Sequence, residues 1–489
     1  MLIEFDNTVA LLKAQSQTEL DAYALVRKQT KTDAPGARYM YQHKLYLMSK
    51  GKRGWDGKAS ILSKTHPVNK FAIFPTGLLP LIYNKLAVLL TANQIQLNDL
   101  RANPNLTIGS YTVPLFDYQA DTLNKVVNNT ITLGGQNYYW PAGVIQIATG
   151  GGKTELAVAL CQAISVPTVF VVHRKHLMTQ AVDRFAKYGI TAGQIGDGIF
   201  NPNPTGITVA TVQTLHNLLN EGDLAKVNQF IKARQLFFDE AHLCASKVAL
   251  GNQFVMIARQ FRHAFYRWGL TATPFMKDEY SNQLLMGCTG DLLCQVSNEQ
   301  LITAGRLTPP KVVIIKVPEV KGPTGWPDVY DSAIVLNRWR NLRIIEELVA
   351  APKPAMVMCS RLGHAKVLHN LAISKGISVP AVLCGDTPNK DRKAAIQDLQ
   401  SGKTEAIICT TIFDEGMDAP ELLTLIMAGG GKSTVAQLQR LGRGLRTAPG
   451  KEEVLVIDFK YTSGAIMKRH SAARRKIWKE QGFNIEERE

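Results

Sequence analysis

Ile147-Ala-Thr-Gly-Gly-Gly-Lys-Thr154 follows the apolar run Val144–Ala148 and leads into the helical run Glu155–Ala163. In a strand–turn–helix of this kind, glycines let backbone N–H groups turn inward around phosphate oxygens, and the helix N-terminus favours negative charge. Lys153 is placed to reach the β- and γ-phosphates of a nucleotide, and the Thr154 hydroxyl to hold Mg²⁺. The stretch therefore predicts a phosphate-binding loop, with candidate ligand-binding residues Thr149, Gly150, Gly151, Gly152, Lys153 and Thr154.

This loop departs from the general pattern at one position, because Ile147 stands where the pattern has its first glycine. The alternative interpretation is an ordinary glycine-rich turn with an incidental lysine. The apolar run before the loop and the helical run after it favour the phosphate-binding interpretation.

A pair of adjacent acids supplies the second part of the predicted site. In Leu236-Phe-Phe-Asp239-Glu240-Ala-His242 an apolar strand ends in two carboxylates, and ligands bind at the carboxyl edge of a parallel sheet. Asp239 can then hold Mg²⁺, while Glu240 orients and deprotonates the attacking water. Alone, such a pair is more often a solvated helix N-cap. Downstream of a phosphate-binding loop, it indicates an enzyme that hydrolyses nucleoside triphosphates.

Short apolar runs alternate with amphipathic helical runs on both sides of a Pro/Gly-rich passage. This alternation is typical of βαβ units, in which a parallel sheet is covered on both faces. The passage, Pro309-Pro310 and then Lys321 to Pro327, predicts a junction between two domains. The predicted strands are Val144–Ala148, Thr168–Val172, Gly206–Ala210, Leu236–Phe238, Ala264–Leu270, Ala355–Cys359, Ala381–Cys384, Ala406–Cys409, Leu423–Met427 and Val454–Asp458.

Four motifs, taken in order, resemble those of superfamily 2 helicases and translocases of the DEAH-box type. Besides the phosphate-binding loop and Asp239-Glu-Ala-His242, they are Gly269-Leu-Thr-Ala-Thr-Pro274 and Gln439-Arg440-Leu-Gly-Arg443-Gly-Leu-Arg446. Their order and spacing match over about residues 111–460. The resemblance implies an α/β fold of two tandem RecA-like domains with ATP and Mg²⁺ in the cleft between them.

The resemblance also implies roles for individual residues. Phe116 is aromatic where relatives often carry a basic residue, so hydrolysis is implied more firmly than the choice of base. The implied contacts are adenine recognition by Gln119, coupling by Thr271 and Thr273, ribose contact near Gly416 and Asp418, a nucleotide contact by Gln439, and arginine fingers at Arg443 and Arg446.

The spacing of the last motif agrees with the arginine-finger role. Gln439, Arg440, Arg443 and Arg446 recur every three to four residues, which places them on one face of a helix. Alone, such a stripe is usually solvated. With a phosphate-binding loop on another domain, guanidinium groups can stabilise charge on the transferring phosphoryl group, an effect worth about 10³–10⁵ in rate. Closing and reopening of the cleft would then move a bound nucleic acid.

Several loops after predicted strands carry residues suited to the phosphate backbone of a nucleic acid. Hydroxyls, amides and cations bond phosphate oxygens without reading bases, so we expect little sequence specificity. Ser or Thr after a strand is more often a helix cap, but coincidence with the family's nucleic-acid motifs favours binding. The candidates are His173, Arg174, Lys175, Thr211, Gln213, Ser360, Arg361, Thr410 and Thr411.

The N-terminal zone is basic from Lys44 to Lys70, where Asp56 is the one acid. Interleaved aromatic residues offer stacking faces beside phosphate-binding charge. The alternative is a small domain whose aromatics form its core and whose lysines are solvated. The candidate contacts are Lys52, Arg53 and Trp55, and the other aromatics are Tyr39, Tyr41, Tyr46, Phe71 and Phe74.

Two further stretches resemble UvsW-like phage helicases. They are Gly54-Trp-Asp-Gly57 with Phe74-Pro-Thr-Gly-Leu-Leu79, and Val456-Ile-Asp458-Phe-Lys with His470, Arg474 and Arg475. This resemblance implies an ATP-dependent DNA helicase that remodels forks, Holliday-type junctions and R-loops in phage replication and recombination repair. The partner would be branched DNA bound without sequence specificity, in the host bacterial cytoplasm, with a monomer as the simplest state.

The predicted organisation has a small basic α+β DNA-binding module at 1–110 and a first motor domain at 111–305. A linker and second motor domain follow at 306–460, and a basic tail at 461–489. In the tail, Lys468–Lys479 either adds a DNA contact or forms an amphipathic helix docked on the second motor domain, with Ile477 and Trp478 buried.

Composition agrees with this interpretation. The 489 residues are 45% hydrophobic and 20% charged, which excludes a disordered chain, and no run is apolar enough to span a membrane. The net charge of +16 favours a polyanionic partner. The seven scattered cysteines predict reduced thiols in a cytoplasmic protein. Three alternatives stay open: a double-strand DNA translocase that separates no strands, an RNA helicase, and a nucleic-acid clamp switched by ATP.

Overall fold

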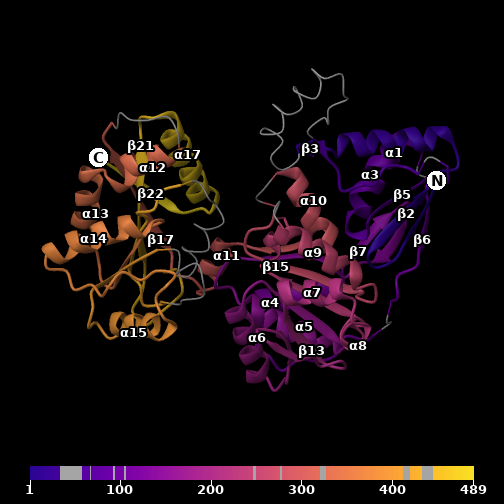
Figure 1. Ribbon diagram of the computed structural model, residues 1–489, viewed down its shortest axis with the longest axis horizontal. Helices are drawn as coiled ribbons and strands as arrows, with labels where there is room; N and C mark the ends of the chain where they lie inside the picture. The colour runs from indigo at the N-terminus through magenta and orange to yellow at the C-terminus, as the bar shows by residue number, and fades with distance from the viewer. Residues whose placement is uncertain are drawn as a thin grey trace. The chain divides into compact units, whose positions relative to one another are not determined.

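The computed structural model describes residues 1–33, 58–66, 68–91, 94–103, 106–245, 249–275, 278–319, 326–410, 419–431 and 444–489. Over these residues the chain divides into two compact units. The first comprises Met1–Ile147 and Gly152–Gln295, and the second comprises Ala148–Gly151 and Val296–Glu489. Each unit contains a largely parallel sheet with flanking helices (Figure 1), which confirms the predicted α/β fold class.

The N-terminal part of the first unit forms a small mixed sheet of order β5-β2-β1-β6. Strand β1 pairs antiparallel with β2 and parallel with β6. Since side chains alternate across a strand, Ile3 and Phe5 share one face, where they are buried with Tyr23 of α1 and Leu86 of α3. The elements are β1 (Leu2–Phe5), β2 (Val9–Lys13), α1 (Gln17–Gln29), β3 (Thr32–Asp33), β4 (Lys58–Ala59), β5 (Phe71–Pro75), α3 (Leu79–Leu89) and β6 (Gln96–Asp99).

This small sheet is fixed to the rest of the first unit. The side-chain amide of Asn7 donates to the carbonyl oxygen of Arg262 (2.9 Å), and the Arg101 guanidinium lies 4.3 Å from the centre of the Trp140 ring. Phe74 is 1% exposed and belongs to the core. Its ring is therefore not available for stacking on a base. This agrees with the alternative prediction, in which the aromatic side chains form the core of a small domain.

The large sheet of the first unit has the order β12-β11-β13-β10-β14-β15-β9-β16. Strands β11, β13, β10, β14, β15 and β9 run parallel to their neighbours in this series, and β12 is antiparallel to β11. The strands, with the flanking hairpin β7–β8, are β7 (Thr130–Leu133), β8 (Gln136–Tyr139), β9 (Ala142–Ile147), β10 (Thr168–Val172), β11 (Gly193–Gly196), β12 (Ile199–Asn201), β13 (Ile207–Thr211), β14 (Gln235–Asp239), β15 (Tyr266–Thr271) and β16 (Leu292–Val296).

Helices pack on both faces of this sheet because its strands are apolar on both sides. In β10, Val169 and Val171 join the core with α7 and α9, whereas the Phe170 ring packs against Phe185 of α6. The predicted strand Thr168–Val172 is confirmed at its full length. The helices are α4 (Asp117–Val127), α5 (Lys153–Ile164), α6 (Lys175–Lys187), α7 (Val212–Glu221), α8 (Leu224–Val227), α9 (Ala249–Gln260) and α10 (Glu279–Cys288).

The sheet of the second unit has the order β19-β18-β20-β21-β17-β22, and its strands run parallel. Its strands are β17 (Pro310–Val317), β18 (Ala355–Met358), β19 (Ala406–Cys409), β20 (Thr424–Ile426), β21 (Val454–Tyr461) and β22 (Asn484–Arg488). Its helices are α11 (Asn298–Thr303), α12 (Trp326–Tyr330), α13 (Arg338–Ala350), α14 (Leu362–Ser374), α15 (Asn389–Gln400) and α17 (Ala465–Glu480).

Two predictions for the second unit are wrong. Pro309-Pro310 does not lie in a linker, because Pro310 begins β17, an inner strand, where a missing N–H at the first residue costs little. Ala381–Cys384 is not a strand: Leu383 makes an isolated bridge to Cys409. A turn then carries the chain away, as the Thr387 N–H donates to the Cys384 carbonyl (3.1 Å).

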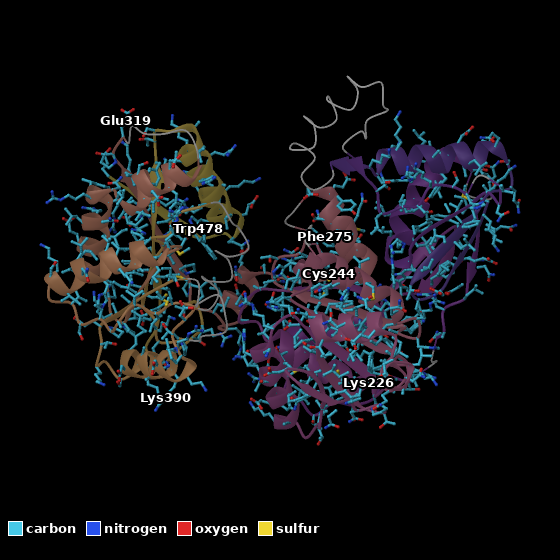
Figure 2. The ribbon with its side chains drawn as sticks, viewed as in Figure 1. Lys226, Cys244, Phe275, Glu319, Lys390 and Trp478 are labelled. Atoms are coloured by element: carbon cyan, nitrogen blue, oxygen red, sulfur yellow. The ribbon has the colours of Figure 1, made fainter. Side chains whose placement is uncertain are left out.

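The C-terminal residues are part of the second unit's core. Trp478 is fully buried and Ile477 is 3% exposed, so α17 docks on the sheet as the amphipathic-helix alternative predicts (Figure 2). Strand β22 pairs with β17. Within the part of the chain described above, no helix has the length and apolarity to cross a membrane. The predicted domain boundaries stay predictions.

Candidate nucleotide and nucleic-acid site

The predicted functional residues of the first unit follow neighbouring parallel strands. Because the strands lie in the order β13-β10-β14-β15-β9, the loops at their carboxyl ends line up along one edge of the sheet. The loops after β9 and β14 hold predicted nucleotide contacts, the loop after β15 holds the predicted coupling residue Thr273, and the loops after β10 and β13 hold predicted nucleic-acid contacts. One edge of the sheet therefore carries both sets of predicted contacts.

The loop between β9 and α5 has the backbone that a phosphate-binding turn requires. Gly150 and Gly152 have φ angles of 91° and 73°, which strain any residue with a Cβ. A Cβ on Gly152 would lie 2.3 Å from Nε2 of Gln119. Helix α5 begins at Lys153, so its N-terminus follows Thr149 to Gly152 directly, and Thr154 stands in its first turn.

Lys153 lies close to both acids of the second motif. Its Nζ donates to the Ile147 carbonyl (3.4 Å), and its charge acts on Asp239 and Glu240. The Glu240 N–H donates to Oδ1 of Asp239 (3.0 Å). Burial and the neighbouring Glu240 charge raise the pKa of Asp239. A cation beside this carboxylate would favour its charged form.

This donor set fits Mg²⁺. The carboxylate of Asp239 and the hydroxyl of Thr154 are hard oxygen ligands, and Mg²⁺ is held in proteins by one or two such groups together with substrate phosphates. Among the described residues, no group of three or more His, Cys, Asp or Glu side chains forms a cage for a metal ion. An ion at this edge would therefore depend on a bound nucleotide for most of its ligands.

Glu240 is held in the state that a general base needs. Its backbone is left-handed (φ 48°). Burial alone would raise the pKa of Glu240, but the hydrogen bond with His242 and the charge of Lys153 hold that pKa below its usual range. Glu240 is therefore ionised at neutral pH and can accept a proton from water.

His242 connects this acid to the loop after β15. Its Nδ1 lies 3.3 Å from Oε2 of Glu240 and 3.1 Å from Oγ1 of Thr271, and the Thr273 N–H donates to that hydroxyl (3.2 Å). Thr271 is fully buried. Sequence reasoning missed this role, because only the fold brings β14 and β15 together. The contacts thus run from Glu240 through His242 and Thr271 to the backbone of Thr273.

Gln119 braces the phosphate-binding loop. The side chain is 1% exposed. Its Nε2 donates to the Gly152 carbonyl (3.0 Å), and its Oε1 accepts from the Phe116 N–H (3.0 Å). These bonds tie the start of α4 to the loop, and adenine recognition by Gln119 stays a prediction.

The predicted nucleic-acid contacts of the first unit differ in exposure. Arg174 and Lys175 are exposed at the start of α6, where Lys175 forms an ion pair with Asp197. Burial lowers the pKa of His173 to about 4, so its imidazole carries no charge for a phosphate at neutral pH. Thr211 is 6% exposed and its Oγ1 lies 3.0 Å from that of Thr214, whereas Gln213 is exposed.

A related arrangement occurs in the second unit. Arg361 is exposed before α14, forms an ion pair with Asp331, and its guanidinium lies 4.6 Å from the centre of the Tyr330 ring. Thr410, after β19, is 7% exposed. In each unit, an exposed basic side chain that forms an ion pair with an aspartate lies where a helix follows a parallel strand. These side chains are Lys175 and Arg361.

One arginine of the last motif is not where its spacing predicts. Arg446 makes an isolated antiparallel bridge with Leu307 and does not continue a helix, although Gly444 is helical. The pairing with Leu307 is a long-range contact that the three-to-four spacing cannot reveal. The other predicted sites lie outside the described residues: Lys52, Arg53, Trp55, Thr411, Gly416, Asp418, Gln439, Arg440 and Arg443.

Comparison with known families agrees with this geometry. Residues 112–276 match the family described as type III restriction enzyme, res subunit, and residues 340–448 match the helicase conserved C-terminal domain. The chain belongs to the superfamily 2 helicases. The first match spans this helicase's phosphate-binding loop, acid pair and β15 loop, and the second spans its arginine motif.

Relatives of this helicase include named DNA motors. It is 27% identical over 405 residues to the DNA 3'-5' translocase XPB2 of Sulfurisphaera tokodaii, covering 74% of this chain and 85% of the relative. It is 22% identical over 344 residues to the ATP-dependent DNA helicase uvsW of Enterobacteria phage T4, covering 66% of this chain and 65% of the relative. The structure of S. cerevisiae Dbp5 bound to RNA and ADP BeF3 matches at a TM-score of 0.51 with 18% identity, covering 76% and 90%. That structural match shows the fold alone.

Proposed function

We propose that this helicase uses ATP to remodel branched DNA, namely forks, Holliday-type junctions and R-loops, in phage replication and recombination repair. The observation that carries the proposal is the linked set Lys153, Asp239, Glu240, His242 and Thr271 at one sheet edge, next to the loops that expose Arg174 and Lys175. The uvsW relative and the net charge of +16 support DNA as the partner.

In the proposed mechanism, different residues act on the phosphates of ATP, on Mg²⁺ and on the attacking water. Lys153 and the loop N–H groups would hold the β- and γ-phosphates of ATP, and Asp239 with Thr154 would hold Mg²⁺, which would neutralise phosphate charge. Glu240 orients the attacking water and takes its proton. Arg443 and Arg446 stabilise the charge that develops on the γ-phosphoryl group.

Movement would follow from the contacts of His242. Loss of the γ-phosphate changes the surroundings of Glu240, which His242 joins to Thr271 and thence to Thr273. The β10 loop with Arg174 and Lys175 lies beside β14 in the same sheet. We propose that the loop after β10 and the loop after β15 shift together. Their shift would move the phosphate backbone of the nucleic acid along this edge of the sheet.

A double-strand DNA translocase is the second candidate function. The archaeal relative, which is named a translocase, shares more identity and length with this chain than the uvsW relative does. The motor residues would act in the same way, but no strands would part. A forked substrate that yields free strands in the presence of ATP favours the helicase.

The proposed function is tested by ATP hydrolysis with no nucleic acid, single-stranded DNA, duplex DNA, a four-way junction and an RNA–DNA hybrid. We expect the junction to stimulate hydrolysis most, and Lys153→Ala to lower the stimulated kcat about 10²-fold, because one preorganised phosphate contact is lost. Equal stimulation by plain duplex would favour the translocase, and stimulation by the RNA hybrid alone would contradict DNA as the partner. Activity that persists in Lys153→Ala would refute the nucleotide site.

Asp197 should compete with nucleic acid for Lys175. Because their ion pair is exposed, we expect Asp197→Asn to tighten binding of single-stranded DNA roughly two- to fivefold by freeing the ammonium for phosphate. Fluorescence anisotropy over a range of salt concentrations measures this. Asp398→Asn removes the same charge from the ion pair that Asp398 of α15 forms with the exposed Lys403, and it should leave the affinity unchanged within the error of the measurement. Equal effects of both variants would show that only net charge matters.

A further inference from the structure

A tight turn places Lys451 beside the arginine motif. In Ala448-Pro-Gly-Lys451, the Lys451 N–H donates to the Ala448 carbonyl (3.1 Å), and Gly450 has a φ of 74°. Proline followed by glycine at positive φ is the pattern of a type II turn. The turn reverses the chain after Arg446, so that the Lys451 side chain lies back over residues it has just passed.

The ammonium of Lys451 is buried and bonded to backbone carbonyls from two segments. The residue is 9% exposed. Its Nζ donates to the carbonyl oxygens of Pro420 (2.6 Å), Gly444 (2.6 Å) and Arg446 (2.9 Å). Burying an ammonium is costly unless hydrogen bonds satisfy it, and these three bonds offset that cost.

The three carbonyls belong to segments with predicted nucleotide contacts. Pro420 comes two residues after Asp418, predicted to lie near the ribose, and Arg446 is itself a predicted arginine finger. We propose that Lys451 is a positioning residue for ATP hydrolysis. This proposal rests on the proposed function. The Lys451 ammonium ties the backbone at Pro420 to the backbone at Gly444 and Arg446, so that Arg446 keeps one placement relative to Pro420.

Further backbone contacts hold the segment Gly444 to Arg446, to which the Lys451 ammonium bonds. The Thr308 N–H donates to the Leu445 carbonyl (2.7 Å), next to the bridge between Leu307 and Arg446. These bonds hold the segment around Arg446 to the residues that connect α11 with β17. The Lys451 ammonium adds hydrogen bonds that connect this segment to Pro420, next to the packing of Gly444 beside Leu422. Removing the ammonium should therefore loosen the connection to Pro420, while the contacts of Leu307 and Thr308 with the segment stay in place.

The test compares two lysines that bond carbonyls in the same way. Lys353 donates to the carbonyls of Leu348, Val349 and Ala351 at the end of α13, where no nucleotide contact is predicted. We expect Lys451→Met to lower kcat of DNA-stimulated ATP hydrolysis roughly 10–100-fold, because small misplacement of a catalytic group is that costly, with KM for ATP within about threefold. Lys353→Met should keep kcat within about twofold.

Thermal unfolding of both variants separates positioning from stability. A fall in kcat for Lys451→Met alone, with comparable melting temperatures, supports the proposal. If Lys451→Met does not fold, Lys451→Gln decides, since its amide keeps one donor in place. A kcat within twofold of wild type in the folded variant overturns the proposal. A wild-type enzyme that hydrolyses no more ATP than Lys153→Ala would instead refute the proposed function itself.

Discussion

Glu240→Gln should lower kcat for DNA-stimulated ATP hydrolysis on the order of 10³-fold and leave ATP binding nearly unchanged. The amide keeps the shape of the side chain and an oxygen for the contact with His242, which lies 3.3 Å away. It cannot accept a proton from water, and a general base is worth about 10²–10⁴ in rate. Steady-state hydrolysis gives kcat, and fluorescence titration with a labelled ATP analogue gives the affinity.

Glu155→Gln is the matched control for this variant. It makes the same chemical change in the first turn of α5, where the carboxylate pairs with Arg184 (2.6 Å) and has no predicted role in proton transfer. We expect its kcat to stay within about threefold of wild type. A Glu240→Gln enzyme that hydrolyses ATP within tenfold of wild type would assign the base to another residue.

Local pattern was sufficient for much of the motor. The glycine-rich loop, the strand before it and the helix after it are neighbours in the chain, so their sequence contains nearly all that determines their conformation. The prediction that Asp239 ends a strand is confirmed, because Leu236, Phe237 and Phe238 are buried on both faces of the sheet. Tandem parallel sheets then follow from the repeated alternation of strands and helices.

The errors arose where distant segments decide the outcome. Pro310 looks like a chain breaker by itself, yet it begins a strand because β21 and β22 come from the far end of the sequence to pair with β17. Ala381–Cys384 is apolar like a strand, but it makes an isolated bridge of Leu383 with Cys409 and the two hydrogen bonds of Leu383 with Ile408 and Thr410, and no ladder. Arg446 leaves its predicted helical face because Leu307 pairs with it.

The contacts that link the motifs could not be predicted from spacing. His242 reaches Thr271 across adjacent strands, and Lys451 reaches Pro420 across 31 positions of sequence. A buried polar side chain finds whichever partner the folded backbone presents, and the linear pattern does not specify that partner. The residues that connect functional loops are therefore the part of the site that depends most on structure.

Arg474→Met should destabilise the second unit strongly. Arg474 is 2% exposed, and its Nε lies 3.0 and 2.9 Å from the carboxylate oxygens of Asp458, also 2% exposed. Removing one partner of a buried pair leaves an uncompensated charge, at a cost of about 3–5 kcal/mol. For a unit of this size, that corresponds to a fall of roughly 10 °C in melting temperature by calorimetry.

Arg475→Met is the control for this prediction, one residue along the same helix. Arg475 also pairs with a carboxylate, that of Glu487 (2.7 Å), but both side chains are more than a third exposed, so its loss should cost no more than about 1 kcal/mol. Similar losses in both variants would contradict the role of burial.

The double variant Arg474→Met with Asp458→Asn separates charge from packing. The amide that Asp458→Asn introduces would carry no buried charge, and its oxygen could still accept from the Trp478 indole N–H, which lies 3.2 Å from Oδ2 of Asp458. If the uncompensated carboxylate causes most of the loss, the double variant is more stable than Arg474→Met alone. If instead the bond from Arg474 to the Gly431 carbonyl (2.9 Å) dominates, the second substitution restores nothing.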